Sequence, residues 1–321
     1  MKLLGATGVK VSPIALGTMA CGGDADEATA RAIWRAARDA GVNLFDTADV
    51  YNAGRSEEIL GRLMQGERDQ IVLATKAYFP TGAGPNDRGT SRYHLVRAVE
   101  ASLRRLATDR IDLYYLHRFD DVTALDETLR GIEDLVRAGK ILYPACSNFA
   151  AWQVAHALGI QRHHGWAPVV ALQPMYNLVK RQAEVEILPM AQSLGLAVIP
   201  YNATGGGLLT GKYAPGRPPP RGRLSEDKMY SVRYADPRYL TIAGQFTALA
   251  AELGHALDKP IDIQHIDRRD VDNIRRRVVN IEKARRMLRW TPQITLERGL
   301  ASTAEWFVRS EFAAEGSLVR P

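Results

Sequence analysis

The stretch NLFDTADVY, residues 43–51, has the pattern of a buried strand followed by a functional loop. Leu44 and Phe45 are apolar, and a carboxylate, Asp46, comes where the strand should end. A phenol, Tyr51, follows in the loop. Burying an unpaired charge is costly. A charged last residue on an otherwise apolar strand therefore indicates a functional group at the strand end.

Later apolar segments end in the same way. IVLATK (71–76) ends in Lys76, DLYYLH (112–117) ends in His117, and YPACSN (143–148) ends in Ser147 and Asn148. If these strands are parallel, their carboxyl ends meet at the same edge of the sheet. The sequence therefore predicts one shared site that is lined by strand ends.

Strand patterns alternate with helix patterns along most of the chain, after an expected hairpin over residues 2–11. Such alternation is typical of a parallel sheet. Eight units would close a (β/α)8 TIM barrel, and about seven are recognisable over roughly 250 residues. The alternative is an open doubly wound sheet, which normally shows a glycine fingerprint after its first strand, and none is present. The helices are expected at 26–40, 56–64, 91–106, 124–138, 150–158, 181–194 and 237–253.

The eighth unit is expected to be atypical. Residues 77–90 and 214–235 are rich in loop-forming residues and have no periodicity. IDIQHI (261–266) alternates and would serve as the eighth strand. We therefore expect a barrel domain over residues 1–255 and an atypical C-terminal segment over residues 256–321, which completes or flanks the barrel.

Composition limits the class of protein. The chain has 321 residues, 46% of them hydrophobic, which suits one large domain with a buried core. It has no apolar run of about 18 residues and no signal-peptide pattern, which predicts a cytoplasmic protein with no membrane span. Cys21 and Cys146 form no metal pattern. The net charge of +6 favours an anionic ligand, such as a phosphorylated cofactor, or is a basic surface without special meaning. No nucleic-acid motif is present.

The strand-end residues suit one chemical task. A free phenol has a pKa of about 10 and is a weak acid at neutral pH. An adjacent ammonium, such as Lys76, stabilises the phenolate. A carboxylate, Asp46, would keep the ammonium charged, and an imidazole, His117, would orient a carbonyl oxygen. We therefore predict that Tyr51 protonates a carbonyl oxygen while a hydride from a bound cofactor attacks the carbon.

Each of these residues also has an ordinary structural explanation. A single Asp–Lys pair across two strands is usually an ion pair, and a single buried histidine is usually a core residue. The placement of four such groups at or just after successive strand ends favours a joint catalytic interpretation. No serine or cysteine nucleophile with a paired base stands out.

Residues 1–255 resemble the aldo-keto reductase family. The resemblance rests on DTADVY, GRSEEILG, LATK, YYLH, SNF, LQPMYN and IPYNATGGGLLTGKY, which occur in that order. It implies a (β/α)8 barrel and NADPH-dependent reduction of a carbonyl substrate. It also implies that the catalytic residues are Asp46, Tyr51, Lys76 and His117, with Tyr51 as the proton donor.

The resemblance also implies roles in cofactor binding. Ser147, Asn148 and Gln173 would hold the nicotinamide carboxamide, and Tyr201 would stack on the ring. Asn202 and Ala203 stand where the family often has Ser-Pro, a difference from which we expect little change. The complete set of cofactor-binding candidates is Thr18, Met19, Asp46, Ser147, Asn148, Gln173, Tyr201, Asn202, Leu208, Gly211 and Lys212, of which Leu208, Gly211 and Lys212 would lie along the pyrophosphate.

The C-terminal segment departs from that family. Residues of about 257–310, with KPIDI, NIEKARRMLRW and ERGL, resemble the C-terminal part of extended short-chain dehydrogenases and nucleotide-sugar epimerases. The arginines in this segment would replace the missing contacts to the 2′-phosphate, meet a diphosphate on the substrate, or form a solvated helix face. NADPH is thus the expected cofactor, and NADH stays open. The arginines concerned are Arg268, Arg269, Arg275, Arg276 and Arg277.

Two functions stay open from sequence. The first is an NADP-dependent aldo-keto reductase that reduces an aldehyde or ketone, with a keto-sugar or a nucleotide-linked sugar as the narrower expectation. The second is a non-catalytic NADP(H)-binding barrel that acts as a sensor or subunit. An epimerase or dehydratase is disfavoured, because the Rossmann fingerprint and the Tyr-x-x-x-Lys pair are missing. The physiological substrate and the oligomeric state do not follow from the sequence.

Overall fold

The computed structural model describes residues 1–213, residues 221–256 and Arg298. The chain divides into two compact units, which are described separately. The first consists of residues 1–175 and 183–201, and the second of residues 176–182 together with the described residues from 202 onward. The expected eighth strand at 261–266 and nearly all of the atypical segment 256–321 lie outside the described residues.

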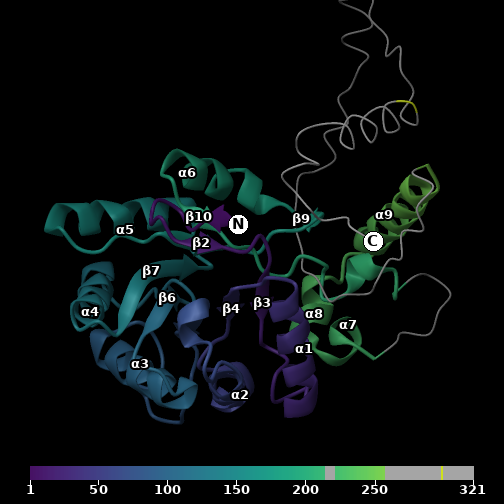
Figure 1. The fold of residues 1–321 in the computed structure, drawn as a ribbon. Helices are drawn as coiled ribbons and strands as arrows, with labels where there is room; N and C mark the ends of the chain where they lie inside the picture. The colour runs from purple at the N-terminus through teal and green to yellow at the C-terminus, as the bar shows by residue number, and fades with distance from the viewer. Residues whose placement is uncertain (214–220, 257–297, 299–321) are drawn as a thin grey trace, which may run out of the picture. The chain divides into compact units, whose positions relative to one another are not determined.

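The first unit is built on a parallel sheet of seven strands (Figure 1). The strands follow one another in space in the same order as in the chain, and every neighbouring pair is parallel. A doubly wound sheet would reverse its order at a switch point, so this order rules that alternative out. The strands are β3 (Ala15–Gly17), β4 (Leu44–Asp46), β5 (Val72–Ala77), β6 (Ile111–Leu116), β7 (Ile141–Ser147), β8 (Ala171–Gln173) and β10 (Ala197–Val198).

The sheet curls around an inner apolar cluster. That cluster takes Ala15 from edge strand β3 and Ala197 from edge strand β10, together with residues of the central strands such as Leu113 and Tyr115. Residues from both edges reach the same cluster only if the sheet bends around it. The architecture is therefore α/β with a curled parallel sheet, which confirms the predicted α/β class, while the predicted eighth unit lies outside the described residues.

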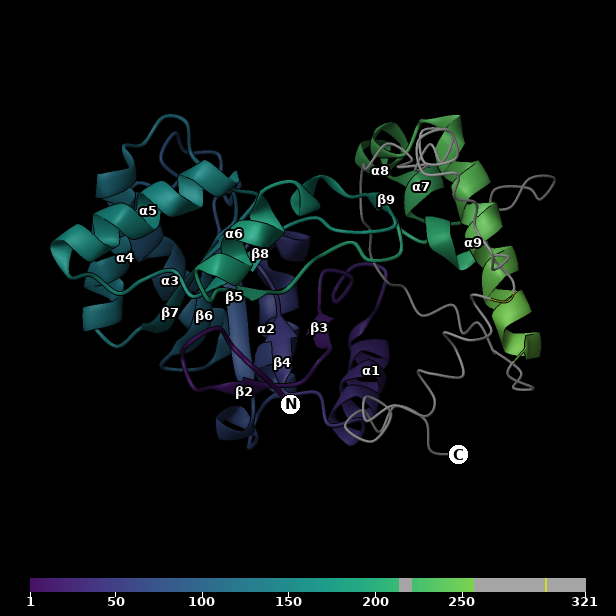
Figure 2. The ribbon, with the colours of Figure 1, turned by 90° about the horizontal axis from the view of Figure 1, so that it is seen from above.

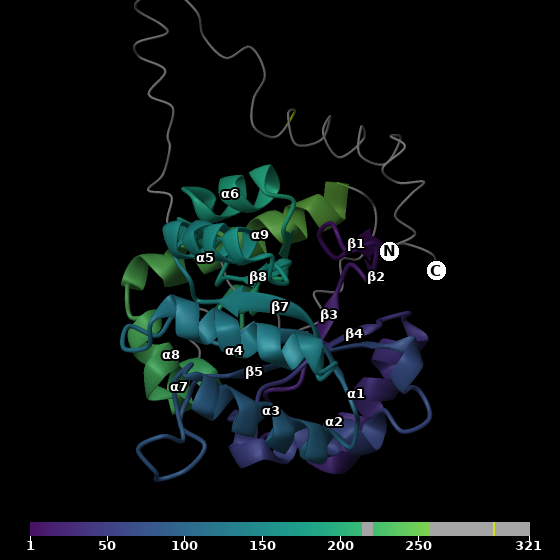
Figure 3. The same cartoon turned by 90° about the vertical axis from the view of Figure 1, so that its left-hand side faces the viewer.

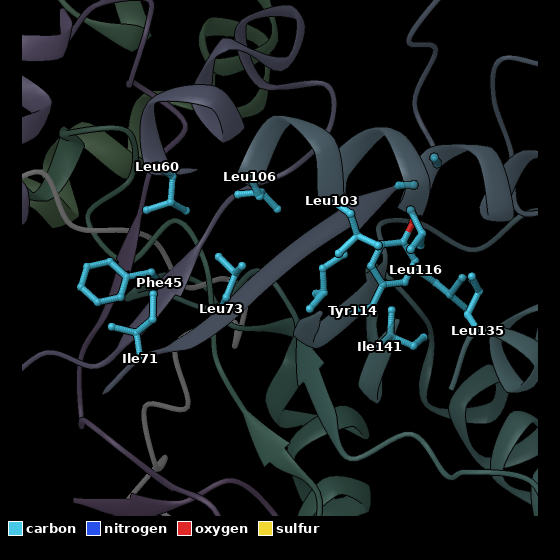
Figure 4. Packing of buried hydrophobic residues seen from close by; sticks show 14 of the residues in the cluster. Phe45, Leu60, Ile71, Leu73, Leu103, Leu106, Tyr114, Leu116, Leu135 and Ile141 are labelled. Carbon is cyan, nitrogen blue, oxygen red and sulfur yellow. The ribbon is translucent and has the colours of Figure 1, made fainter. Parts of the chain in front are cut away.

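Helices cover the outer face of the sheet. They are α1 (Glu27–Asp39), α2 (Arg55–Leu63), α3 (Arg92–Leu106), α4 (Leu125–Arg137), α5 (Ala151–His164) and α6 (Ile187–Ser193). Helices α1 to α4 each pack on the next along the chain, and Figure 3 shows α4 and α5 side by side. Figure 4 shows the outer core, in which Phe45, Leu73 and Tyr114 of the strands meet Leu60 and Leu106 of the helices.

The N-terminal hairpin closes one end of the inner cluster. Strands β1 (Lys2–Leu3) and β2 (Lys10–Val11) are antiparallel, and the fully buried Leu4 joins the inner cluster. Gly5 has a φ of 57°, and a Cβ there would lie 2.8 Å from the backbone oxygen of Val170. The turn therefore needs a glycine at this position.

Three elements differ from the sequence-based expectation. Helix α5 extends to His164 instead of ending at Leu158, because Gly159 is accommodated within the helix. The helix expected at 181–194 is reduced to the 3-10 turn η3 (Gln182–Glu184) and α6, since Pro189 is tolerated only in the first turn of a helix. The loop expected at 214–235 contains two short helices in its described part.

The second unit has its own small core. Its elements are β9 (Val179–Lys180), the 3-10 turn η4 (Leu208–Thr210), α7 (Arg223–Glu226), α8 (Lys228–Arg233) and α9 (Pro237–Ala256), and Figure 2 shows the three α-helices in green. Helix α8 begins at a cap, because the side chain of Asp227 accepts a hydrogen bond from the Met229 backbone N–H. Val179, Leu208, Tyr230 and Ala243 bury one another. No helix in the described part of the chain is long and apolar enough to cross a membrane.

Candidate active site

Lysine 76 is the centre of a buried polar cluster in the first unit. The Lys76 side chain is 0% exposed. Its Nζ donates hydrogen bonds to Oδ1 of Asp46 and, at 2.7 Å, to the backbone oxygen of Thr47. Nε2 of Gln173 donates to the other carboxylate oxygen of Asp46 at 2.8 Å. The strand ends of β4, β5 and β8 thus meet at one ion pair.

The Tyr51 ring lies over Lys76, and the His117 ring packs against Tyr51. Nζ of Lys76 is 5.1 Å from the centre of the Tyr51 ring. The Tyr51 ring is edge-on to the His117 ring, with 5.9 Å between the ring centres. The structure therefore brings together all four catalytic candidates predicted from the sequence.

The surroundings set the protonation of Lys76 and His117. Burial disfavours the ammonium of Lys76, but the carboxylate of Asp46 and the phenol of Tyr51 outweigh it and raise the pKa of the lysine. Burial, together with the nearby Lys76, holds the pKa of His117 well below its usual value. At neutral pH the site therefore contains an ammonium and a neutral imidazole.

Tyr51 opens a tight turn. The three residues after it are left-handed, with φ of 49° at Asn52, 55° at Ala53 and 90° at Gly54. Asn52 and Ala53 adopt this conformation at a cost, because it is unfavourable for residues with a Cβ. Nδ2 of Asn52 donates to the backbone oxygens of Met19 at 2.9 Å and Cys21 at 2.8 Å. This side chain ties the Tyr51 turn to the loop after β3.

Thr18 forms hydrogen bonds with the residues on either side of the Tyr51 turn. Its backbone N–H donates to the oxygen of Asp46 at 2.9 Å, and its hydroxyl is 2.8 Å from that of Ser56. The Ser56 hydroxyl is also 3.0 Å from that of Thr47. In this structure Thr18 is thus part of the frame that holds Asp46, and the backbone of Met19 anchors Asn52.

The amide and hydroxyl candidates form a second group at the ends of β7 and β8. Nδ2 of Asn148 donates to the backbone oxygen of His117 at 2.9 Å and to Oγ of Ser147 at 3.0 Å. The hydroxyl of Tyr201 donates to Oδ1 of Asn148 at 2.6 Å, and Oγ of Ser147 donates to the backbone oxygen of Gln173 at 2.9 Å. These four residues therefore lie together, beside the tetrad formed by Asp46, Tyr51, Lys76 and His117.

Sequence reasoning missed Phe79. This ring packs edge-on against His117, with 4.9 Å between ring centres, and Tyr78 packs against it in turn. Its position just after the strand that carries Lys76 is the only sequence feature that could have indicated it. The surrounding loop has no periodicity, so nothing in the pattern singled out this residue.

The remaining candidates belong to the second unit. Asn202 is buried with a φ of 66°, and its Nδ2 donates to the hydroxyl of Tyr234 at 3.2 Å. Gly205, Gly206 and Gly207 all have positive φ, as does Gly211 after η4.

The side chain of Lys212 lies over this glycine loop. A Cβ added at Gly207 would meet Cε of Lys212 at 2.4 Å. Glycines at positive φ, which carry no Cβ, and a lysine in one loop are features that suit a phosphate group. The residues of this loop therefore fit the pyrophosphate of a dinucleotide.

Comparison with known proteins agrees with this geometry. The family model of the aldo/keto reductases matches residues 13–259, about three quarters of the chain. The chain belongs to the aldo/keto reductase family. The family assigns it to the oxidoreductases that act on small carbonyl compounds, and it implies a (β/α)8 barrel.

Individual relatives carry two kinds of name. An oxidoreductase of Bacillus subtilis, YrpG, is 44% identical over 220 residues, which cover 65% of this chain and 68% of the relative. A protein of Oryza sativa named as a voltage-gated potassium channel subunit beta is 36% identical over 263 residues, or 80% of each chain. The aldo-keto reductase YhdN of Bacillus subtilis is 40% identical over 212 residues, which cover 64% of this chain and 62% of the relative. The second resemblance, of residues 257–310, gains no support from these comparisons.

Proposed function

We propose that this protein is an NADPH-dependent reductase that converts an aldehyde or ketone into an alcohol. The observation that carries the proposal is the buried Lys76–Asp46 ion pair, with Tyr51 and a neutral His117 packed beside it. A buried ion pair alone is weak evidence of function. A phenol and an imidazole above the pair make it a proton-delivery site.

Tyr51 is the proposed proton donor. Its hydroxyl gives a proton to the carbonyl oxygen, and the charged Lys76 stabilises the phenolate that remains. Asp46 holds Lys76 in place. His117, neutral and 8% exposed, orients the carbonyl oxygen. The nicotinamide, when bound, supplies the hydride for the carbon.

Different residues are proposed to bind the carboxamide, the nicotinamide ring and the pyrophosphate of the cofactor. Ser147, Asn148 and Gln173 offer the hydroxyl and amide groups that a carboxamide needs for hydrogen bonding. Tyr201 would stack on the nicotinamide ring, and Thr18 and Met19 would line its pocket. Leu208, Gly211 and Lys212 would run along the pyrophosphate, and Asn202 precedes them.

The preference for NADPH over NADH rests on sequence. The arginines of the segment 256–321 supply the planar fork that suits a 2′-phosphate. We propose that Arg269 and Arg275 take this role. NADH is the alternative cofactor if they do not.

The substrate class is an aldehyde or ketone that tolerates an aromatic neighbour. Phe79 packs against His117 and would also contact a bound carbonyl compound. A keto-sugar or nucleotide-linked sugar remains the narrower proposal, and it rests on the resemblance of the C-terminal segment alone.

A second candidate function is a non-catalytic NADP(H)-binding subunit. It is favoured by relatives named as potassium channel beta subunits in Oryza sativa and Arabidopsis thaliana, which are 36% and 37% identical to this chain. The intact tetrad favours the reductase.

Titration with NADPH and with NADH, monitored by tryptophan fluorescence, tests which cofactor binds. A screen of carbonyl compounds as substrates then separates the two functions. The reductase predicts NADPH binding together with oxidation of NADPH by aldehydes such as 4-nitrobenzaldehyde. Binding without turnover would favour the subunit, and binding of neither nucleotide would contradict both. Arg269→Ala and Arg275→Ala should weaken NADPH binding more than NADH binding, whereas equal loss would rule out their role at the 2′-phosphate.

A further inference from the structure

A second buried charged cluster lies behind the tetrad, and the proposed reaction does not use it. It consists of Asp49 in the Tyr51 loop, Glu57 on α2 and Arg105 on α3. Asp49 is 2% exposed and Glu57 is 0% exposed. Two carboxylates are thus buried around a single guanidinium.

Glu57 accepts hydrogen bonds from Arg105 and from Thr75. Nε of Arg105 donates to its Oε2 at 2.7 Å, and the hydroxyl of Thr75 donates to its Oε1 at 2.6 Å. Both oxygens of Glu57 are therefore hydrogen-bonded, and the charge of Arg105 is matched by the charge of Glu57.

Asp49 has no comparable partner. Within the described ranges, neither of its carboxyl oxygens has a well-aligned hydrogen-bond partner. The nearby backbone N–H of Val50 lowers the pKa of Asp49, but by less than burial raises it. Lys76 is bonded to Asp46 and Thr47, and Arg105 to Glu57, so neither of these two nearby cations pairs directly with Asp49. The ionisable groups that act on it are Glu57 from α2, Arg105 from α3, Lys76 from β5 and Tyr114 from β6.

An unpaired buried carboxyl favours its neutral form. Burial, and then the charge of Glu57, raise the pKa of Asp49 to about 8, against partial opposition from Arg105, the Val50 backbone N–H and Lys76. Burial and the same two acids raise the pKa of the Tyr114 phenol well above its usual value. Both groups are therefore neutral at neutral pH.

Asp49 is coupled to the catalytic residues by the backbone. Its N–H donates to the backbone oxygen of Lys76 at 3.1 Å, and the Tyr51 N–H donates to the oxygen of Ala48 at 3.2 Å.

Arg105 also contacts the left-handed turn that follows Tyr51. A Cβ at Gly54 would lie 2.8 Å from its Cδ. A charge on Asp49 would therefore compete with Glu57 for Arg105 and disturb the side chain that packs on this strained turn.

We propose that Asp49 is a positioning residue that acts as a neutral carboxylic acid, and that loss of its proton to solvent displaces the Tyr51 turn and lowers the rate of reduction. This inference rests on the proposed reductase function. It makes Asp49 a pH-sensitive support of Tyr51 and gives it no direct contact with substrate.

The test compares kcat against pH for the full-length wild type, Asp49→Asn and Glu58→Gln, with NADPH and 4-nitrobenzaldehyde. A group with a pKa of about 8 is about nine-tenths ionised at about pH 9, so the wild type should lose about tenfold in kcat from its neutral plateau. Asp49→Asn mimics the neutral acid and should keep its plateau rate through this range. The control residue Glu58 is exposed on α2, next to Glu57, and Glu58→Gln should show the same pH dependence as the wild type.

Two results would overturn the inference. One is an alkaline limb in Asp49→Asn identical to that of the wild type. The other is a folded Asp49→Asn that binds NADPH normally but is inactive at every pH, because a neutral isostere should support Tyr51.

Infrared spectroscopy of the wild type provides a test that needs neither turnover nor a folded variant. A band from a protonated carboxylic acid should be present at about pH 7 and lost by about pH 10, since a pKa of about 8 lies between them. Absence of this band would overturn the inference even if reduction is observed. Its presence without any carbonyl reduction would count against the proposed function and not against the protonation of Asp49.

Discussion

His117 illustrates how burial determines the chemistry of a single residue. Its Nδ1 is buried and has no hydrogen-bond partner among the described residues, and its ring is enclosed by Tyr51 and Phe79. Because the folded protein disfavours the imidazolium, the pKa of His117 lies below that of a free histidine. A neutral imidazole is what an orienting hydrogen bond to a carbonyl oxygen requires, since the imidazolium would compete with Tyr51 as the proton donor.

The lowered pKa of His117 has a consequence for stability. Below about pH 6.5 the unfolded chain binds a proton at this histidine that the folded chain does not, so the free energy of unfolding should fall as pH decreases. Each pKa unit of difference between the folded and unfolded states changes the free energy of unfolding by about 1.4 kcal/mol. Urea unfolding between about pH 7 and pH 5 should therefore show a smaller loss in His117→Gln than in the wild type.

His156→Gln is the control for this measurement, because His156 is exposed on α5. It should retain the acid-side loss of the wild type. An identical loss in His117→Gln and the wild type would show that His117 titrates normally.

At the scale of the element, the position of Tyr51 depends on close packing between α2 and α3. Gly61 lies on α2, and a Cβ there would come within 2.7 Å of the backbone oxygens of Arg105 and Leu106. The two helices therefore approach more closely than any side chain at this position would allow. Helix α2 starts directly after the left-handed turn, so its placement also places the turn.

Gly61→Ala should lower the free energy of unfolding by about 1–3 kcal/mol, the usual cost of overpacking a core. The matched control is Gly159→Ala on α5, where an added Cβ meets nothing within 4 Å. Alanine is the better helix former, so this control should be neutral or stabilise the protein by up to about 1 kcal/mol. Urea unfolding of both variants checks the pair, and equal effects would contradict the close-packing argument.

Most of the elements in the first unit could be predicted from sequence, because apolar periodicity identifies both strands and amphipathic helices. Helix α1, for example, begins at Glu27, within a residue of the expected boundary, and the side chain of its N-cap Asp26 accepts a hydrogen bond from the Thr29 N–H. The run of left-handed residues at Asn52 and Ala53 could not be predicted, since the contacts that hold it come from the distant loop after β3 and from Arg105 on α3. Helices α7 and α8 were missed because they are too short to show a period.

The proposed catalytic residues could also be located from the sequence. Asp46, Lys76 and His117 lie at the ends of β4, β5 and β6 or one residue from them, and parallel strands bring their ends together. Asp49 could not be singled out, because its lack of a partner depends on Glu57 taking Arg105, a contact between residues far apart in sequence. Phe79 was missed because a loop has no period to read.

At the scale of the whole molecule, the chain separates into two units with different proposed tasks. The first unit contains the complete tetrad and the amide group of Asn148. The second contains the glycine loop and Lys212. Family membership extends over both, because the matched residues run from 13 to 259. Carbonyl reduction is therefore proposed as a property of the whole chain. Within that proposal, the role of Tyr51 as proton donor is the most specific claim.

The central claim is that Tyr51 donates the proton, and Tyr51→Phe tests it most directly. NADPH and 4-nitrobenzaldehyde would be mixed with the wild type and the variant in single-turnover experiments, with the dissociation constant of NADPH measured in parallel by fluorescence. Loss of a positioned general acid should slow reduction about 10²–10⁴-fold. Cofactor affinity should remain within about twofold, because the phenyl ring keeps the packing on Lys76 and His117. A variant that binds NADPH normally and reduces the aldehyde at the wild-type rate would contradict the account.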